Sequence, residues 1–146
     1  MGDEWVKKAD MQTARVLFGT AAVDGKIYAV GGMGNNFGLL FNSTEVYDPI
    51  KDLWQKKADM NIWRDIHSVA SVNGKIYAMG GCLLNNDWLS SVEEYDPQKD
   101  EWTKKKDMPT GRSSSASAVL NDKIFLIGGW RLFVSFADVY SYAHSG

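Results

Sequence analysis

A nine-residue pattern of apolar positions occurs three times along the chain: DGKIYAVGG at residues 24–32, NGKIYAMGG at 73–81 and NDKIFLIGG at 121–129. Each copy opens with a turn pair, Asp-Gly, Asn-Gly or Asn-Asp, of the kind that favours a tight hairpin. The short run that follows is rich in β-branched and aromatic residues and predicts a strand. A double glycine ends each run, which indicates a sharp bend or a close approach of two backbones.

The predicted strand is apolar on both of its faces. In the first copy Ile27 and Ala29 point one way, and Tyr28 and Val30 point the other. A sheet with one face in water would instead alternate apolar and polar residues. We therefore expect sheets that stack face to face, each covered on both sides.

Further patterns repeat in the same phase as the glycine-ended run. Each repeat has a tryptophan six residues before a methionine, an arginine four residues after that methionine, and a stretch of small apolar residues before the turn pair. After a variable loop, a short stretch ends in Tyr-Asp-Pro at 47–49 and 95–97. Each repeat thus predicts four short strands, and no segment shows an amphipathic helix with both caps. The repeated tryptophans are Trp5, Trp54 and Trp102, and we expect them to pack between sheets. The repeated arginines are Arg15, Arg64 and Arg112.

A period near 50 residues with four strands in each unit is typical of a β-propeller. The double glycine, the Tyr-Asp-Pro and the spaced tryptophan resemble the kelch repeat over essentially residues 5 to 142; Ser141 and Tyr142 depart from it in the third copy. We expect an all-β kelch propeller made of one domain, residues 1–146. Its repeats are placed at about 12–60, 61–108 and 109–142, with an N-terminal strand at 4–8.

The order of the strands predicts how the ring closes. The chain opens with a fourth strand and ends with a third, and it has only three blades where propellers have about four to eight. The two ends cannot meet within one chain. We expect a homodimer that closes a six-bladed ring, in which the strand at 4–8 completes the last sheet of the partner. The alternative, a fragment of a longer propeller, stays open.

Composition narrows the classes of partner and location. The net charge of −2 gives no reason to expect nucleic acid or an anionic membrane as a partner. The sequence shows no apolar run long enough for a membrane helix and no signal peptide. Cys82 is the single cysteine, which fits a reducing compartment, so we expect a cytoplasmic protein.

Candidate catalytic residues are few. His67, His144 and Cys82 do not form a recognisable metal set, and the nucleophile and nucleotide-binding motifs are absent from the sequence. We expect no catalytic residue, no metal and no cofactor. His67 is interpreted as a buried histidine and Cys82 as a small buried apolar residue.

The loops that break the repeat, residues 33–43, 82–90 and 130–135, are unusually apolar. In kelch proteins, which these residues resemble, such loops and the neighbouring turns form a recognition surface. By that resemblance an arginine ring beside loop aromatics would suit an acidic peptide segment. The alternative is that the arginines pair inside the fold and the aromatics pack on one another. The predicted partner-binding residues are Arg15, Arg64, Arg112, Asn36, Phe37, Trp88, Trp130 and Arg131.

These observations favour a non-catalytic module that binds a partner peptide or protein through one propeller face. One alternative is an isolated or engineered half-propeller that has no ligand. Another is a kelch-type enzyme such as a sugar epimerase or oxidase, for which the sequence offers no acid–base or metal constellation. Many kelch proteins are substrate receptors of ubiquitin ligases, but the additional domains of such proteins are absent from this sequence.

Overall fold

The computed structural model describes residues 2–35 and 38–144, and this part of the chain contains strands and no helix. The described residues therefore include no helix that is long and apolar enough to cross a membrane. The strands are β1 (Gly19–Val23), β2 (Lys26–Val30), β3 (Thr44–Asp48), β4 (Leu53–Lys57), β5 (Ser68–Val72), β6 (Lys75–Met79), β7 (Val92–Asp96), β8 (Glu101–Lys104), β9 (Ala116–Leu120), β10 (Lys123–Ile127), β11 (Trp130–Arg131), β12 (Val134–Ser135) and β13 (Val139–Tyr142).

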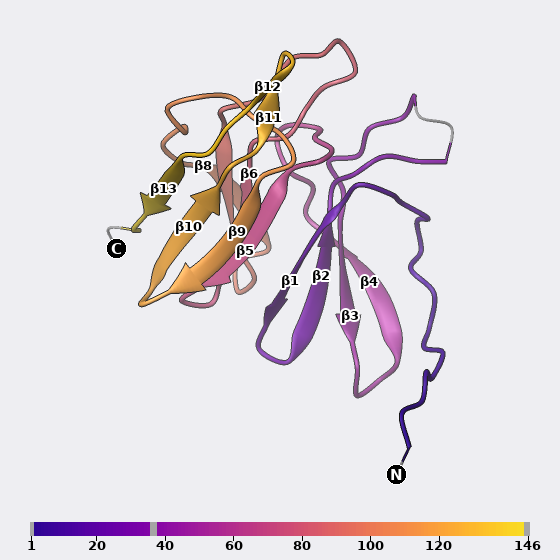
Figure 1. The fold of residues 1–146 in the computed structure, drawn as a ribbon. Coiled ribbons are helices and arrows are strands. Elements are labelled where there is room, and N and C mark those ends of the chain that lie inside the picture. Colours follow the sequence, from indigo (N-terminus) through magenta and orange to yellow (C-terminus); the bar gives the residue numbers. More distant parts are fainter. Residues whose placement is uncertain (1, 36–37, 145–146) are drawn as a thin grey trace.

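Eleven of these strands form three antiparallel sheets that we call blades 1, 2 and 3 (Figure 1). Blade 1 has the order β1-β2-β3-β4 and blade 2 the order β5-β6-β7-β8, as the repeats predict. Blade 3 has only three strands, in the order β13-β10-β9, and β11 and β12 form a separate hairpin in its loop. The turn pairs join the first two strands of each blade in left-handed backbone, with φ of 50° at Asp24 and 72° at Gly25.

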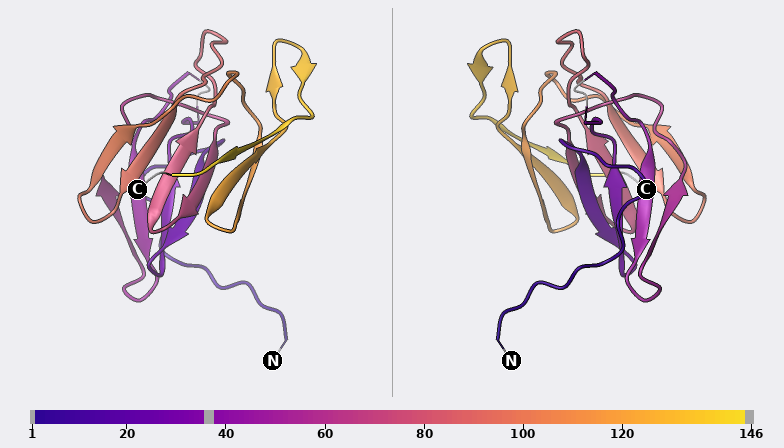
Figure 2. Two further views of the ribbon diagram at one scale, coloured as in Figure 1. Left: turned by 90° about the vertical axis from the view of Figure 1, so that its left-hand side faces the viewer. Right: turned by 90° about the vertical axis from the view of Figure 1, so that its right-hand side faces the viewer.

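The first strands of the three blades lie side by side. β1 packs beside β5, and β5 beside β9. Backbone hydrogen bonds link the residues just before these strands: the Ile66 N–H donates to the Leu17 carbonyl over 3.0 Å, and the Ser114 N–H donates to the Ile66 carbonyl over 2.9 Å. The blades thus fan out from a hydrogen-bonded inner line, and the fourth strands lie on the outside (Figure 2).

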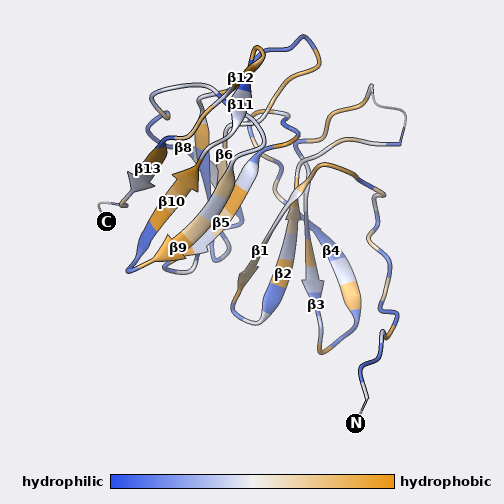
Figure 3. Cartoon of the chain, viewed as in Figure 1, coloured by the Kyte–Doolittle hydropathy of each residue, from blue (hydrophilic) through white to orange (hydrophobic). Residues whose placement is uncertain are grey.

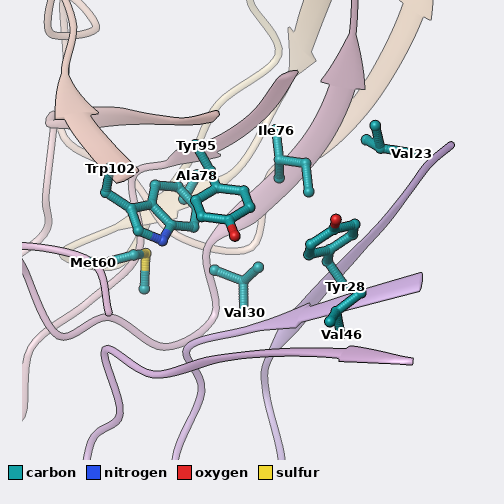
Figure 4. Packing of buried hydrophobic residues seen from close by; sticks show 9 residues of the cluster. All are labelled: Val23, Tyr28, Val30, Val46, Met60, Ile76, Ala78, Tyr95 and Trp102. Carbon is teal, nitrogen blue, oxygen red and sulfur yellow. The ribbon is translucent and has the colours of Figure 1, made fainter. Parts of the chain in front are cut away.

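The core lies between the blades. Figure 4 shows the cluster between blades 1 and 2, where the Trp102 and Tyr95 rings of blade 2 face Val30 and Met60. The Trp102 indole N–H donates to the Ala58 carbonyl over 3.0 Å, so the ring is buried without an unpaired donor. The remaining members are Val23, Tyr28, Val46, Ile76 and Ala78.

The double glycines allow backbone segments to approach closely. Gly81 has φ of +100°, and a Cβ there would lie 2.6 Å from the Asp65 carbonyl oxygen. Its N–H donates to the carbonyl of Arg112 in the next repeat over 2.9 Å. Only glycine fits this combination of backbone and space, which confirms the interpretation of the repeated pair.

The N-terminal segment forms no strand in this single chain. Residues 9–13 bind to blade 1, where the Ala9 N–H donates to Asp52 over 2.9 Å and the Trp54 indole donates to the Ala9 carbonyl over 3.0 Å. Residues 2–8 then trail away (Figures 1 and 2). The expected packing of tryptophans between blades is confirmed for Trp102, whereas Trp5 is fully exposed.

Blade 3 exposes apolar side chains on the face that looks away from blade 2. Leu120, Ile127 and Val139 are each about half exposed, and Figure 3 shows the hydrophobic stretches along β9 and β10. Blade 2 has a neighbouring blade on each of its faces. Residues 9–13 cover part of the outer face of blade 1, where Ile27 is still 42% exposed. The last blade of the chain therefore has one uncovered apolar face.

Candidate functional site

The repeated arginines are structural, not exposed. Arg64 precedes β5 and its guanidinium donates to the Gly80 carbonyl over 2.8 Å, to the Ser91 carbonyl over 3.0 Å and to Glu93 over 3.0 Å. Both charged side chains are almost fully buried. Burial lowers the pKa of Arg64, and the facing Glu93 carboxylate partly offsets that shift.

The same clamp occurs in the other two repeats. Arg15 donates to the Gly31 carbonyl over 2.9 Å and to Glu45 over 2.6 Å. Arg112 donates to the Gly128 carbonyl over 2.9 Å and to Asp138 over 2.6 Å. Each arginine therefore ties the double glycine to the third strand of its own blade. The prediction that Arg15, Arg64 and Arg112 contact a partner is corrected here, since their guanidinium groups are enclosed and already paired.

His67 is also enclosed. It lies in the bend between the Arg64 segment and β5, next to Gly31 of blade 1, and neither ring nitrogen has a hydrogen-bond partner among the described residues. Burial, together with the nearby Arg64 charge, lowers the pKa of His67 to about 3. The ring is thus neutral at physiological pH, and its burial agrees with the sequence interpretation.

Cys82 follows the second double glycine and is half-buried. Its thiol donates to the Leu83 carbonyl over 3.2 Å, and burial raises its pKa. A raised thiol pKa disfavours the reactive thiolate. Among residues 2–35 and 38–144, no three His, Cys, Asp or Glu side chains are grouped so that they could hold a metal ion.

An open apolar groove lies on the loop end of blades 1 and 2. Its volume is about 380 Å³. The loop between β2 and β3, the segment between β4 and β5 and the loop between β6 and β7 each contribute to it, and Figure 1 shows these segments gathered at one end of the blades. We call it the loop groove; its lining residues are Leu40, Trp63, Leu83, Leu84 and Asn85.

Trp63 stands out within the loop groove. It is 55% exposed, and the positions before the arginines of the other repeats hold Ala14 and Gly111. A tryptophan that replaces a small residue in only one repeat is not required by the blade structure. Sequence reasoning missed Trp63 because it looked for pattern-breaking residues in the loops alone. The mismatch at this repeat position was the available signal.

Two of the predicted loop aromatics meet each other. The rings of Trp88 and Trp130 lie 5.4 Å apart in an edge-to-face arrangement, and Phe133 lies edge-on to Trp130 at 6.2 Å. Phe133 is 93% exposed and Trp130 is partly exposed. Arg131 is exposed on the same β11–β12 hairpin. These aromatics therefore pack on one another and still present a surface. Asn36 and Phe37, the two other predicted loop residues, lie outside the described residues.

Comparison with known proteins agrees with the repeat pattern. The family described as "Kelch motif" matches residues 14–61 and 67–109. Kelch-like protein 33 of Homo sapiens is 43% identical over 47 residues, which is 32% of this chain and 8% of that protein. The structure titled "Structure of YjhT" superposes with a TM-score of 0.87 at 21% identity, over 98% of this chain and 52% of the YjhT chain.

How much these similarities establish depends on the sequence identity and on the share of each protein that is matched. This chain spans about half of the YjhT chain and a small part of Kelch-like protein 33. The structural likeness, at its low identity, establishes the fold. The motif matches cover more than half of the chain and coincide with blades 1 and 2. On this evidence the chain belongs to the kelch-repeat family.

Proposed function

We propose that this chain is a non-catalytic protein-interaction module that binds an apolar segment of a partner protein in the loop groove. The observation that carries the proposal is the exposed Trp63 ring beside Leu83 and Leu84. Together with Leu40, these residues come from three segments at one end of the blades, and none of them is a member of the clusters between blades. Exposed tryptophans beside aliphatic residues are typical anchors of protein interfaces.

The geometry supports an apolar ligand in place of the acidic peptide expected from the sequence. The three arginine charges are neutralised within the fold by Glu45, Glu93 and Asp138. Arg131 is an exposed cation on the loop side, at the β11–β12 hairpin. A groove of about 380 Å³ accommodates one or two apolar side chains. The Trp130–Phe133 pair would extend the contact beyond it.

A peptide-display selection against the intact chain tests this function. We expect enriched peptides to share aromatic or aliphatic residues. Their binding should weaken at least about 30-fold in the Trp63→Ala/Leu84→Ala variant, because both residues line the groove. Ile50→Ala is the matched control, since Ile50 is an exposed apolar residue in the turn between β3 and β4, at the opposite end of blade 1.

The selection can also contradict the proposal. If no peptide is enriched, or if the double variant binds the enriched peptides as well as the wild type does, the loop groove is not a binding site. If acidic peptides are enriched and Arg131→Ala abolishes their binding while Trp63→Ala/Leu84→Ala does not, the acidic-segment alternative replaces the apolar one.

We also propose that two chains close a six-bladed ring as a homodimer. Three observations support it: blade 3 lacks a fourth strand, its outer face is apolar, and residues 2–8 of the same chain pair with no strand among the described residues. The YjhT chain, which shares the fold, is about twice as long. Exposed apolar faces and open sheet edges favour association.

A further inference from the structure

A cavity of about 340 Å³ opens beside β13, between blades 2 and 3. Its walls are mainly apolar and come from β6, β7, the segment after β8, β10 and β13. Among the described residues, no strand pairs with the outer edge of β13, so the cavity is open on the side where blades 1 and 2 carry their fourth strands. The lining residues that matter below are Met79, Met108, Ile124, Leu126 and Tyr140.

The interface between blades 1 and 2 has the same walls, and there these side chains are fully buried. By repeat position, Val30 corresponds to Met79, Met60 to Met108, Ile76 to Ile124, Ala78 to Leu126 and Tyr95 to Tyr140. One further side chain fills the space there, the Trp102 ring of β8 (Figure 4). The cavity beside β13 is therefore the place of a missing fourth-strand tryptophan.

The fourth-strand tryptophans of blades 1 and 2 make the same contacts. Trp54 pairs with Tyr47 across the sheet, and Trp102 pairs with Tyr95. The ring centroids lie 5.2 Å and 5.1 Å apart, respectively. Each indole donates over 3.0 Å to a backbone carbonyl of the segment that enters the blade, Ala9 for Trp54 and Ala58 for Trp102. In blade 3 the corresponding residue is Lys106, which lines the cavity.

An aspartate two residues before each tryptophan completes the arrangement. Asp52 accepts from the Tyr47 hydroxyl over 2.6 Å and from the Ala9 N–H over 2.9 Å. Asp100 accepts from Tyr95 and from the Ala58 N–H over the same distances. The chain contains one further Asp-x-Trp sequence in phase with these two, Asp3-Glu4-Trp5. Trp5 is fully exposed in the single chain.

We infer that the cavity beside β13 is the binding site for Trp5 of a second copy of this chain. Trp5 then pairs with Tyr140 and donates to the Lys106 carbonyl. Asp3 accepts from the Tyr140 hydroxyl and from the Lys106 N–H. Val6 lies opposite Val139. This inference rests on the proposed ring closure and assigns the residues that carry it.

The Trp5 that fills the cavity must come from a second copy, because the N-terminal segment of each chain is held on its own blade 1. Residues 9–13 are fixed on blade 1 through Asp52 and Trp54. The N-terminal segment and β13 lie on opposite sides of the molecule, with blades 1 and 2 between them (Figures 1 and 2). Residues 2–8 therefore cannot reach the β13 edge of their own chain.

Sedimentation velocity on the 146-residue chain tests the inference. We expect the wild type to sediment at twice its 16.3 kDa chain mass. Trp5→Ala should raise the dissociation constant at least about 100-fold, with Trp5→Phe intermediate, because loss of a buried tryptophan removes a large apolar contact. Trp63→Ala is the control, since it removes an exposed tryptophan at the loop groove and should leave the dimer intact. Because Trp5 contacts nothing in the single chain, its replacement leaves the folded chain unaffected.

A disulfide tests the register in the Cys82→Ser background. Val6→Cys combined with Val139→Cys should give a crosslinked dimer on a non-reducing gel. Val6→Cys combined with Leu120→Cys, on the opposite edge of blade 3, should not. A wild-type monomer, or a dimer that Trp5→Ala leaves unchanged, overturns the inference. Peptide binding by a monomer would leave the loop-groove function intact, and a Trp5-dependent dimer without peptide binding would contradict only that function.

Discussion

The buried ion pair of blade 2 offers a quantitative test of how this fold is stabilised. The Arg64 and Glu93 side chains are nearly inaccessible to water. Glu93 accepts from Arg64 over 3.0 Å through one oxygen, and through the other from the Asn61 backbone and side-chain N–H groups over 2.7 Å each. Glu93→Gln keeps the size of the side chain but replaces one acceptor oxygen with a donor NH₂ group.

The expected cost follows from this geometry. The amide oxygen of the substituted side chain can face either Arg64 or Asn61, and in both orientations its NH₂ group must then face a donor. One charge-assisted hydrogen bond weakens, and at least one donor that is buried (Arg64) or partly buried (Asn61) loses its acceptor. Hydrogen bonds to charged groups contribute roughly 1.5–3 kcal/mol, and an unpaired buried donor costs roughly 1–3 kcal/mol. We expect Glu93→Gln to lower the free energy of unfolding by about 3 kcal/mol.

Urea unfolding followed by far-UV circular dichroism measures the effect. With a denaturant slope of roughly 2 kcal/mol/M, the midpoint should fall by about 1.5 M. Lys99→Ala is the control, because Lys99 reaches Asp96 only at 4.0 Å from an exposed position, and exposed pairs contribute less than about 1 kcal/mol. Equal midpoints for the two variants would refute the reasoning, since the carbonyls of Gly80 and Ser91 would then suffice to hold Arg64.

Two further substitutions test the histidine and the double glycine. His67→Phe introduces the residue that the first repeat carries as Phe18. The folded pKa of His67, about 3, lies below its ordinary 6.5, so the unfolded chain binds the proton first and stability falls as the pH drops from 6.5 to 3. His67→Phe should flatten that part of the pH profile of urea midpoints, and parallel profiles would contradict the assignment. Gly81→Ala should cost at least about 3 kcal/mol and Gly74→Ala about 1 kcal/mol. Both glycines have positive φ, but only at Gly81 does an added Cβ meet a backbone oxygen. Similar melting temperatures for the two variants would contradict the close-approach explanation.

The repeated sequence was sufficient to predict the blades. Turn pairs such as Asn73-Gly74, β-branched and aromatic runs, and the glycine pairs are local signals, and each acts within a few residues. They predicted the strands of blades 1 and 2 and the first three strands of blade 3. They also predicted a fourth strand at 4–8, which does not form in the single chain because no sheet edge lies within its reach.

The candidate site was only partly accessible from the sequence. Arg64 beside apolar loops suggested a binding ring, but repeat position alone cannot show whether a side chain at a bend turns outward or back onto its own blade. The structure decided this, because the bend at Gly80 brings carbonyl groups and Glu93 around the guanidinium. Trp63 was missed because its exposure depends on how three segments distant in sequence meet at one end of the blades.

The sequence by itself therefore determined the kelch repeat, the strand order and the number of repeats, since these depend on short-range turn and strand preferences. The tertiary structure alone decided which charges are neutralised inside the fold, where an apolar groove opens, and that a tryptophan-sized cavity remains beside β13. The physical reason is that burial is a property of neighbouring blades, and the last blade of this chain has a neighbour on only one side.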